Sequence, residues 1–264
     1  MTYRLPDRPL RNLMGSPAAA SRLVVSVALH VAAGGVLTVV AASMLAGQGG
    51  LPEAYVGYVA ACYAVTAFLM SLHLGGHAPH AHFGTANRIT LTRGMIASLL
   101  GGAVPVVTAL GSQALWAASA AALLALVLDG VDGWIARRTR MASAYGQHLD
   151  INLDTVMMGI LALLAWQGGK AGAWVLAIGL ARYVFVAAGW FWPWLNSELP
   201  FSQRRRVVCV VQIAVLLVCL TPLMVPPVSS LAAAAALGLL LFSFAVDTLW
   251  LLKAGAGKRT SQRT

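Results

Sequence analysis

Apolar segments long enough to cross a bilayer recur along nearly the whole chain, and they restrict its fold more than any other feature. Of its 264 residues, 59% are hydrophobic and 10% charged. A membrane helix needs about 20 apolar residues, because each residue adds about 1.5 Å of length. The pattern predicts an all-α fold, a polytopic membrane helical bundle of about eight transmembrane helices. The expected spans are Leu23–Ala46, Ala54–Leu72, Ile89–Leu110, Gln113–Ile135, Gly146–Trp166, Ala171–Leu195, Val207–Met224 and Ser229–Leu252.

The positive charge of the chain alternates between its loops. Arginine and lysine gather before the first span, at the start of the third, between four and five, between six and seven, and after the eighth. The intervening loops hold only Lys170. The positive-inside rule then predicts both termini and the loop between spans four and five on the cytoplasmic side, in a membrane such as the bacterial inner membrane. No nucleic-acid partner is expected from the net charge of +10, because no module that reads nucleic acid accompanies it.

Half of the acidic residues lie together, between two apolar runs. Asp129 and Asp132 are three residues apart, and Asp150 and Asp154 are four apart, so each pair shares one helix face. If residues 137–145 form the turn of a helical hairpin, the two pairs converge at matched depths. An ionisable group in a membrane segment is costly, and its default interpretation is functional.

Four carboxylates at close range require a counter-charge. Each pair spans about 4.5 to 6 Å along its helix, and in a low-dielectric site the four groups cannot all stay ionised without a cation among them. Hard oxygen ligands favour Mg²⁺ or Mn²⁺, and no histidine or cysteine lies in matching register. The sequence therefore predicts a metal site, with candidate ligands Asp129, Asp132, Asp150 and Asp154.

The residues between the acids favour a nucleotide diphosphate over a bare ion. Gly133 and Ala136 leave room for a flat group near the backbone, Arg137 offers a forked donor to phosphate, and Gly146 is a second small residue. The pattern Asp-x2-Asp-Gly-x2-Ala-Arg-x8-Gly-x3-Asp-x3-Asp runs from Asp129 to Asp154. This pattern resembles the signature of the CDP-alcohol phosphotransferase (CDP-alcohol phosphatidyltransferase) family, both in the residues at all of its specified positions and in the numbers of residues between them.

A second segment resembles the same family. Asn87, Thr90 and Arg93 recur every three residues at the start of span three, which on its own is typical of a helix cap with membrane-anchoring charge. The segment is similar to the family's Pro-Asn-x2-Thr-x2-Arg entry, with Ala86 in place of proline. The resemblance divides the chain into residues 1–84, with two extra helices and a histidine-rich loop, and 85–264, a six-helix core with a basic tail. Pro105 should kink the third span.

The family resemblance implies a transfer reaction. An acceptor alcohol attacks the β-phosphorus of a CDP-linked donor, normally CDP-diacylglycerol, and CMP is released. Asp129, Asp132 and Asp150 would hold one or two Mg²⁺ ions, of which we expect two, and Asp154 would take the proton of the acceptor hydroxyl. Family members are commonly homodimers, so a second copy of the chain is a possible partner. The cytidine and phosphates would contact Gly133, Ala136, Arg137, Gly146, Asn87 and Thr90.

The acceptor is less constrained than the donor. Arg182 lies in the middle of a span, where it either binds the acid cluster or a substrate phosphate, or donates to backbone. Arg204, Arg205 and Arg206 serve as membrane anchors and also as candidates for an acceptor phosphate. These arginines favour glycerol 3-phosphate or another phosphorylated polyol.

Other polar or reactive residues have simpler expected roles. The four histidines between His73 and His82 are interpreted as a polar connector rather than a metal site, because Gly75, Gly76 and Pro79 prevent a rigid helix. The three cysteines lie in different spans, without metal-ligand spacing, and are expected to pack as small apolar residues.

Two alternative functions compete with the enzyme. A divalent-cation transporter would also place carboxylates on membrane helices, but it has no need for small residues and an arginine at fixed offsets. A non-catalytic scaffold is disfavoured because all four acids are present.

Overall fold

The computed structural model describes residues 17–72, 74, 83–139, 143–197 and 202–261. Within these ranges the chain is helical and contains no strand, which confirms the expected all-α bundle. The histidines between His73 and His82 lie outside the described residues. The long helices are α2 (Pro17–Gly49), α3 (Ala54–Ser71), α4 (Thr85–Ala103), α5 (Ser112–Arg138), α6 (Ala144–Gln167), α7 (Leu176–Phe191), α8 (Gln203–Leu220) and α9 (Val228–Ser261).

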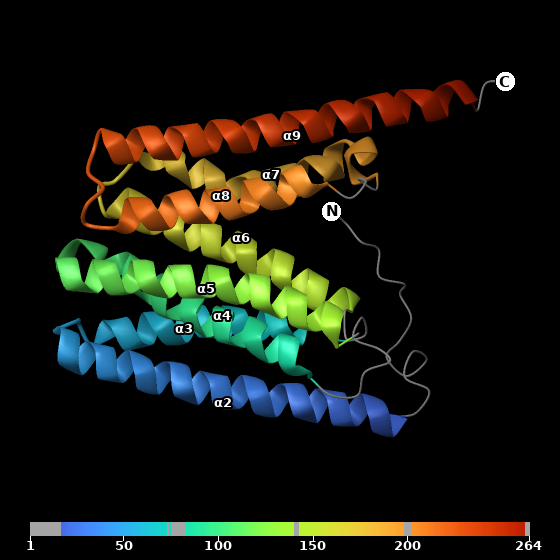
Figure 1. Ribbon diagram of the computed structural model, residues 1–264. Helices are drawn as coiled ribbons and strands as arrows, with labels where there is room; N and C mark the ends of the chain where they lie inside the picture. The colour runs from blue at the N-terminus through green and yellow to red at the C-terminus, as the bar shows by residue number, and fades with distance from the viewer. Residues whose placement is uncertain (1–16, 73, 75–82, 140–142, 198–201, 262–264) are drawn as a thin grey trace.

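Consecutive helices run in opposite directions from α2 to α9 (Figure 1). Not all of them are packing neighbours: α5 packs on α4 and α8, and α6 packs on α4, α7 and α8. The start of α2 and the end of α9 lie at the same end of the bundle, together with the end of α5 and the start of α6 (Figure 1). The two pairs of aspartates, one near the end of α5 and the other in the first half of α6, therefore lie toward that end.

Seven of the eight helices are long and apolar enough to cross a membrane. The exception is α8, for which a span was expected from Val207 to Met224. Helix α8 is 18 residues long and starts with Gln203 followed by three arginines. With three charged residues in so short a helix, it is not apolar enough along its whole length to count as a membrane span. The chain is thus an integral membrane protein whose α8 packs within the bundle.

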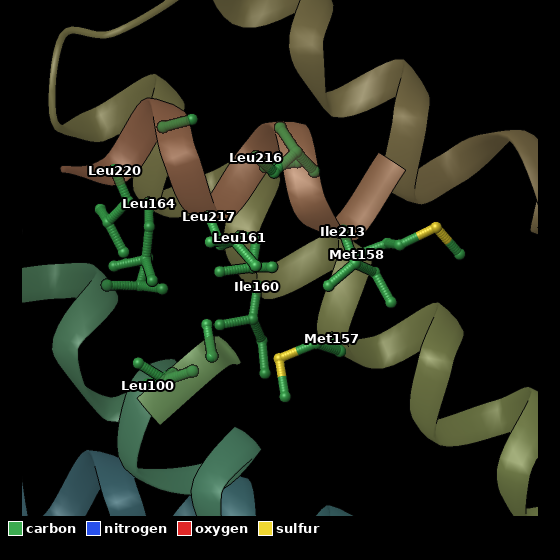
Figure 2. Packing of buried hydrophobic residues seen from close by; sticks show 14 of the residues in the cluster. Leu100, Met157, Met158, Ile160, Leu161, Leu164, Ile213, Leu216, Leu217 and Leu220 are labelled. Atoms are coloured by element: carbon green, nitrogen blue, oxygen red, sulfur yellow. The ribbon is translucent and has the colours of Figure 1, made fainter. Parts of the chain in front are cut away.

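Helices α4 and α6 form the centre of the bundle. In their membrane stretches, 67% of α4 and 50% of α6 is buried, compared with 17–28% in the other five candidate spans. Figure 2 shows leucines of α6 packed against leucines of α8, with Leu100 of α4 on another side of the cluster. Leu161, Leu164, Leu216 and Leu220 are almost fully buried there. The two most buried helices carry the Asn87–Arg93 segment and the second pair of aspartates, whereas α5, which carries the first pair, is the least buried of the candidate spans.

The α-helical part of the third span ends where Pro105 was expected to kink it. After Ala103 the chain continues as a 3-10 helix, Val104–Ala109, with the proline in its first turn. Proline removes a backbone donor and clashes with the preceding turn, which explains the change. The structure thus shows a change of helix type at this proline, and the kink itself stays a prediction.

Helix α3 lies unusually close to α4. A Cβ atom added to Gly102 would lie 2.3 Å from Cγ2 of Val59 and 2.9 Å from its backbone nitrogen, so only glycine fits there. The hydroxyl of Tyr55 donates to the carbonyl of Leu99 over 3.2 Å, and Tyr145 of α6 donates to Met70 of α3 over 2.6 Å. The two N-terminal helices are therefore packed directly on the central ones.

Candidate functional site

Three helices bring the four aspartates together. Asp129 and Asp132 come from α5, Asp150 and Asp154 from α6, and α4 contributes the residues that meet them. Helix α6 begins at a defined point, because the side chain of Ser143 accepts a hydrogen bond from the nitrogen of Gly146 over 3.1 Å. From this start, Asp150 and Asp154 lie on the face of α6 that meets Arg93 of α4.

The guanidinium of Arg93 contacts all four carboxylates. Its Nη2 lies 2.8 Å from Asp129 and 2.5 Å from Asp154, and its Nη1 lies 3.2 Å from Asp132 and 2.5 Å from Asp150. The side chain of Arg93 is only 5% exposed. A planar guanidinium with five donors suits several carboxylates at once. One positive charge still leaves the cluster with an excess of negative charge.

The cluster opens on the side of Asp150. The side chain of Asp150 is 42% exposed, whereas that of Asp132 is 6% exposed. Arg93 also borders a cavity of about 10 Å³, whose other lining residues are apolar and include Ala97, Leu153 and Ile213. A ligand therefore reaches the carboxylates from the Asp150 side.

Three of the aspartates fit a divalent cation. One carboxylate oxygen each from Asp129, Asp132 and Asp150 lies within 4.8 Å of the other two. Ligand oxygens on opposite sides of Mg²⁺ are about 4.2 Å apart, so a small adjustment would bring these three around one ion. Oδ1 of Asp129 is buried and receives no hydrogen bond of normal geometry from the described residues, although it pairs with Arg93 by distance. An acceptor in this position is suited to a metal.

Of the residues expected to bind CDP, Thr90 contacts this group directly, and Asn87 and Gly146 lie close to each other. Thr90 donates to Oδ2 of Asp132 over 3.0 Å. Asn87 is buried, donates to the carbonyl of Phe83, and its Oδ1 would lie 3.4 Å from a Cβ atom at Gly146. Gly133 follows Asp132 on α5 and is partly buried. The side chains of Ala136 and Arg137 lie outside the described residues.

Asp154 is approached by two further helices. Oδ2 of Asp154 accepts a hydrogen bond from the thiol of Cys209 on α8, with a sulfur–oxygen distance of 3.7 Å. Arg182 on α7 is half-buried and lies near enough to Asp154 for their charges to attract. Arg182 makes no hydrogen bond with the described part of the chain, so its guanidinium is available to a ligand.

The arginine run at the start of α8 is divided by Asp247 of α9. Arg204 donates to Asp247 over 2.5 Å and to the carbonyl of Ser243 over 2.9 Å, and Arg205 lies 3.4 Å from the same carboxylate. The side chain of Arg206 is exposed. Arg204 is therefore largely occupied by protein acceptors, whereas Arg206 faces outward.

Two residues at the site were not among the residues predicted from the sequence. Arg93 was interpreted as membrane-anchoring charge and as part of the family's entry motif, without a role at the site, and Cys209 was interpreted as a small packing residue. For Arg93 a signal was present, because it lies nine residues into its helix and shares a stripe with Asn87 and Thr90. For Cys209 no such signal exists, since its partner Asp154 lies 55 residues away in the sequence.

The fold and the site together define an integral membrane protein with a buried acidic centre suited to a divalent cation. Residues 83–246 match the CDP-alcohol phosphatidyltransferase family, and the chain belongs to that family. The match confirms the resemblance found in the two sequence motifs. The family is a class of transferases that move a phosphatidyl group from a CDP-alcohol, and its members typically use a divalent metal. No solved structure matches the chain.

Proposed function

We propose that the protein transfers a phosphatidyl group from CDP-diacylglycerol to an acceptor alcohol with release of CMP. The observation that carries the proposal is the convergence of four aspartates from α5 and α6 around Arg93 of α4. The family match supports the reaction class. The acidic centre lies on helices that face lipid elsewhere, which suits a donor with two acyl chains.

The donor half of the proposed site consists of carboxylates and small residues. Asp129, Asp132 and Asp150 would hold Mg²⁺ or Mn²⁺, and the bound ions, two in our expectation, would neutralise the charge that builds on the departing CMP. Asn87, Gly146 and the hydroxyl of Thr90 line the same end of α4 and α6. Gly133, Ala136 and Arg137 are assigned to the cytidine and phosphates by their places in the sequence motif.

Asp154 is the proposed base. Its carboxylate would accept the proton of the acceptor hydroxyl as the oxygen attacks phosphorus. Asp154 lies beside the three proposed metal ligands but is not part of that group. Hydrogen bonds from Arg93 on α4 and from Cys209 on α8 hold the Asp154 carboxylate at the edge of the cluster.

The acceptor half is proposed to lie toward α7 and α8. Arg182 is half-buried, interacts electrostatically with Asp154 and has no hydrogen-bond partner in the described ranges, so it suits an anionic group on the acceptor. Arg206 faces outward and would meet that anion during entry. Arg204 and Arg205 would act more weakly, because Asp247 already draws on their charge. This arrangement favours a phosphorylated polyol such as glycerol 3-phosphate.

A divalent-cation carrier fits the packing less well. A transported ion needs a polar path past its binding site. Arg93 occupies the space between the four carboxylates, where a transported ion would have to pass. The small cavity next to Arg93 is otherwise lined by apolar side chains.

The decisive experiment is CMP release from CDP-diacylglycerol by purified protein with Mg²⁺ and a panel of acceptor alcohols. We predict that Asp154→Asn lowers kcat by about 10²- to 10⁴-fold, because it removes the proton acceptor. The variant should still bind CDP-diacylglycerol, since the three other aspartates remain. Mass spectrometry of the lipid product identifies the acceptor.

Asp129→Asn provides the contrast. This change removes a proposed metal ligand, so Mn²⁺ binding measured by electron paramagnetic resonance should weaken, whereas Asp154→Asn should leave it largely intact. Normal turnover by Asp154→Asn would show that the base is wrongly assigned. Metal flux into vesicles without CMP release from wild type would favour the carrier instead.

A further inference from the structure

The thiol of Cys209 is the second donor to the proposed base. Oδ1 of Asp154 accepts from Nη2 of Arg93, and Oδ2 accepts from Sγ of Cys209. Each carboxylate oxygen is thus held by a different helix, α4 on one side and α8 on the other. A carboxylate with a donor on each oxygen has little freedom to rotate about its Cβ–Cγ bond.

The other two cysteines have no such relation to the site. Cys219 is buried and its thiol donates to the carbonyl of Ser229. Cys62 of α3 packs against α4, where its sulfur would lie 2.8 Å from a Cβ atom at Gly101. Packing in α8 next to Cys209 is supplied by Val208 and Ile213, both 3% exposed. Cys209 also packs against this apolar core, so a test of its contact with Asp154 must separate hydrogen bonding from packing.

A thiol has a property that a stronger donor lacks. S–H is a weak hydrogen-bond donor, so it orients an oxygen without competing strongly for it. An incoming hydroxyl can then deliver its proton to Oδ2 of Asp154.

We propose that Cys209 is a positioning residue for phosphatidyl transfer, which orients the Oδ2 side of Asp154 toward the acceptor hydroxyl. The inference rests on the proposed function, because it assumes that Asp154 accepts the acceptor's proton. The proposal gives α8 a part in the reaction through Cys209, in addition to the positive charge of the arginines at its start.

The test compares Cys209→Ala, which removes the donor, with Cys209→Ser, which keeps one at nearly the same place. Cys62→Ala is the matched control, a partly buried cysteine away from the acids. We expect Cys209→Ala to lower kcat by about threefold to tenfold, with the KM for CDP-diacylglycerol within about twofold of wild type. Cys209→Ser should recover part of kcat, because its hydroxyl still orients the carboxylate but competes more strongly for the oxygen, and Cys62→Ala should match wild type.

Thermal unfolding of each variant separates orientation from folding. Equal kcat in wild type and Cys209→Ala would overturn the inference, and so would an equal loss in the alanine and serine variants, which would mean that packing alone matters. Failure of the underlying function looks different: wild type itself would then release no CMP with any acceptor.

Discussion

At the residue scale, the acid cluster depends on Arg93 for its charge balance. Removal of one partner from a buried ion pair leaves an uncompensated charge, which costs about 3–5 kcal/mol. Arg93 is in contact with four carboxylates, and its side chain is 5% exposed. The residue is thus expected to matter for stability as well as for the geometry of the site.

We predict that Arg93→Met lowers the thermal unfolding midpoint and abolishes CMP release, because the four carboxylates repel one another without their shared donor. Arg93→Lys should retain part of both, since an ammonium keeps the charge but not the planar fork. Unfolding monitored by tryptophan fluorescence in detergent, with and without Mg²⁺, measures the effect. Addition of Mg²⁺ should stabilise Arg93→Met more than wild type, because the ion replaces the missing positive charge.

Arg88→Met is the matched control for this prediction. Arg88 is exposed on the first turns of the same helix, so its loss should change neither the midpoint nor the response to Mg²⁺ substantially. If Arg93→Met proved as stable as Arg88→Met, the guanidinium could not be the main counter-charge of the cluster.

The four aspartates were predictable because their evidence is local. Spacings of three and four residues place each pair on a helix face whatever the rest of the fold does. Contacts between helices are different: Arg93 meets acids 36 to 61 residues away, and such pairings depend on how each helix is rotated about its axis. The contacts of Arg204 and Arg205 with Asp247 were equally hard to predict, because Asp247 lies on another helix, α9, and is far from both arginines in the sequence.

At the element scale, the position of α7 depends on its crossing with α6. A Cβ atom at Gly179 would lie 2.6 Å from Cα of Gly159 and 3.1 Å from its nitrogen. Both atoms belong to backbone, which cannot move aside as a flexible side chain can. Arg182 follows Gly179 by three residues, so this crossing also sets the distance of Arg182 from Asp154.

We predict that Gly179→Ala destabilises the protein by about 1–3 kcal/mol, because its methyl group forces the two helices apart. The KM for a phosphorylated acceptor should also rise, since Arg182 moves with α7. Gly159→Ala is an exacting control from the same crossing: a Cβ atom there meets nothing within 4 Å. Thermal unfolding and acceptor titration of both variants provide the measurement, and equal effects would contradict the proposed packing.

Helix positions were largely predictable, whereas their ends depended on particular residues. Span four was expected at Gln113–Ile135, and α5 covers Ser112–Arg138. Span six was expected as one helix from Ala171 to Leu195. Instead α7 is confined to Leu176–Phe191, between short 3-10 turns, the second of which begins at Pro193. The hydrophobic pattern locates a membrane segment, but glycine and proline decide where its regular helix stops.

At the scale of the whole molecule, helices α2 and α3 precede the part that matches the family, residues 83–246. The division of the chain after residue 84 stays a prediction. The packing shows that these two helices are not loosely attached, because α3 contacts α4 through glycines and through hydrogen bonds such as Tyr55 to Leu99. Tyr63 of α3 also donates to the carbonyl of Val31 in α2. The extra pair therefore braces the helix that carries Arg93.

This arrangement makes Gly102 a test of how the two parts are joined. We predict that Gly102→Ala lowers the thermal unfolding midpoint by about 3 to 10 °C, because its Cβ atom would overlap Val59, including the backbone of α3. Gly102 lies nine residues, or about 13 Å, along α4 from Arg93. At a temperature where the variant stays folded, kcat should therefore remain within about twofold of wild type.

Gly57→Ala is the control on the opposite helix, because a Cβ atom at Gly57 meets nothing within 4 Å. Its midpoint should equal or slightly exceed that of wild type, since alanine favours helix over glycine. An unchanged midpoint in Gly102→Ala would mean that α3 is not held against α4 at this glycine. A large loss of kcat in a stably folded Gly102→Ala would instead mean that the N-terminal pair acts on the carboxylates through α4, which would join the two parts functionally as well as physically.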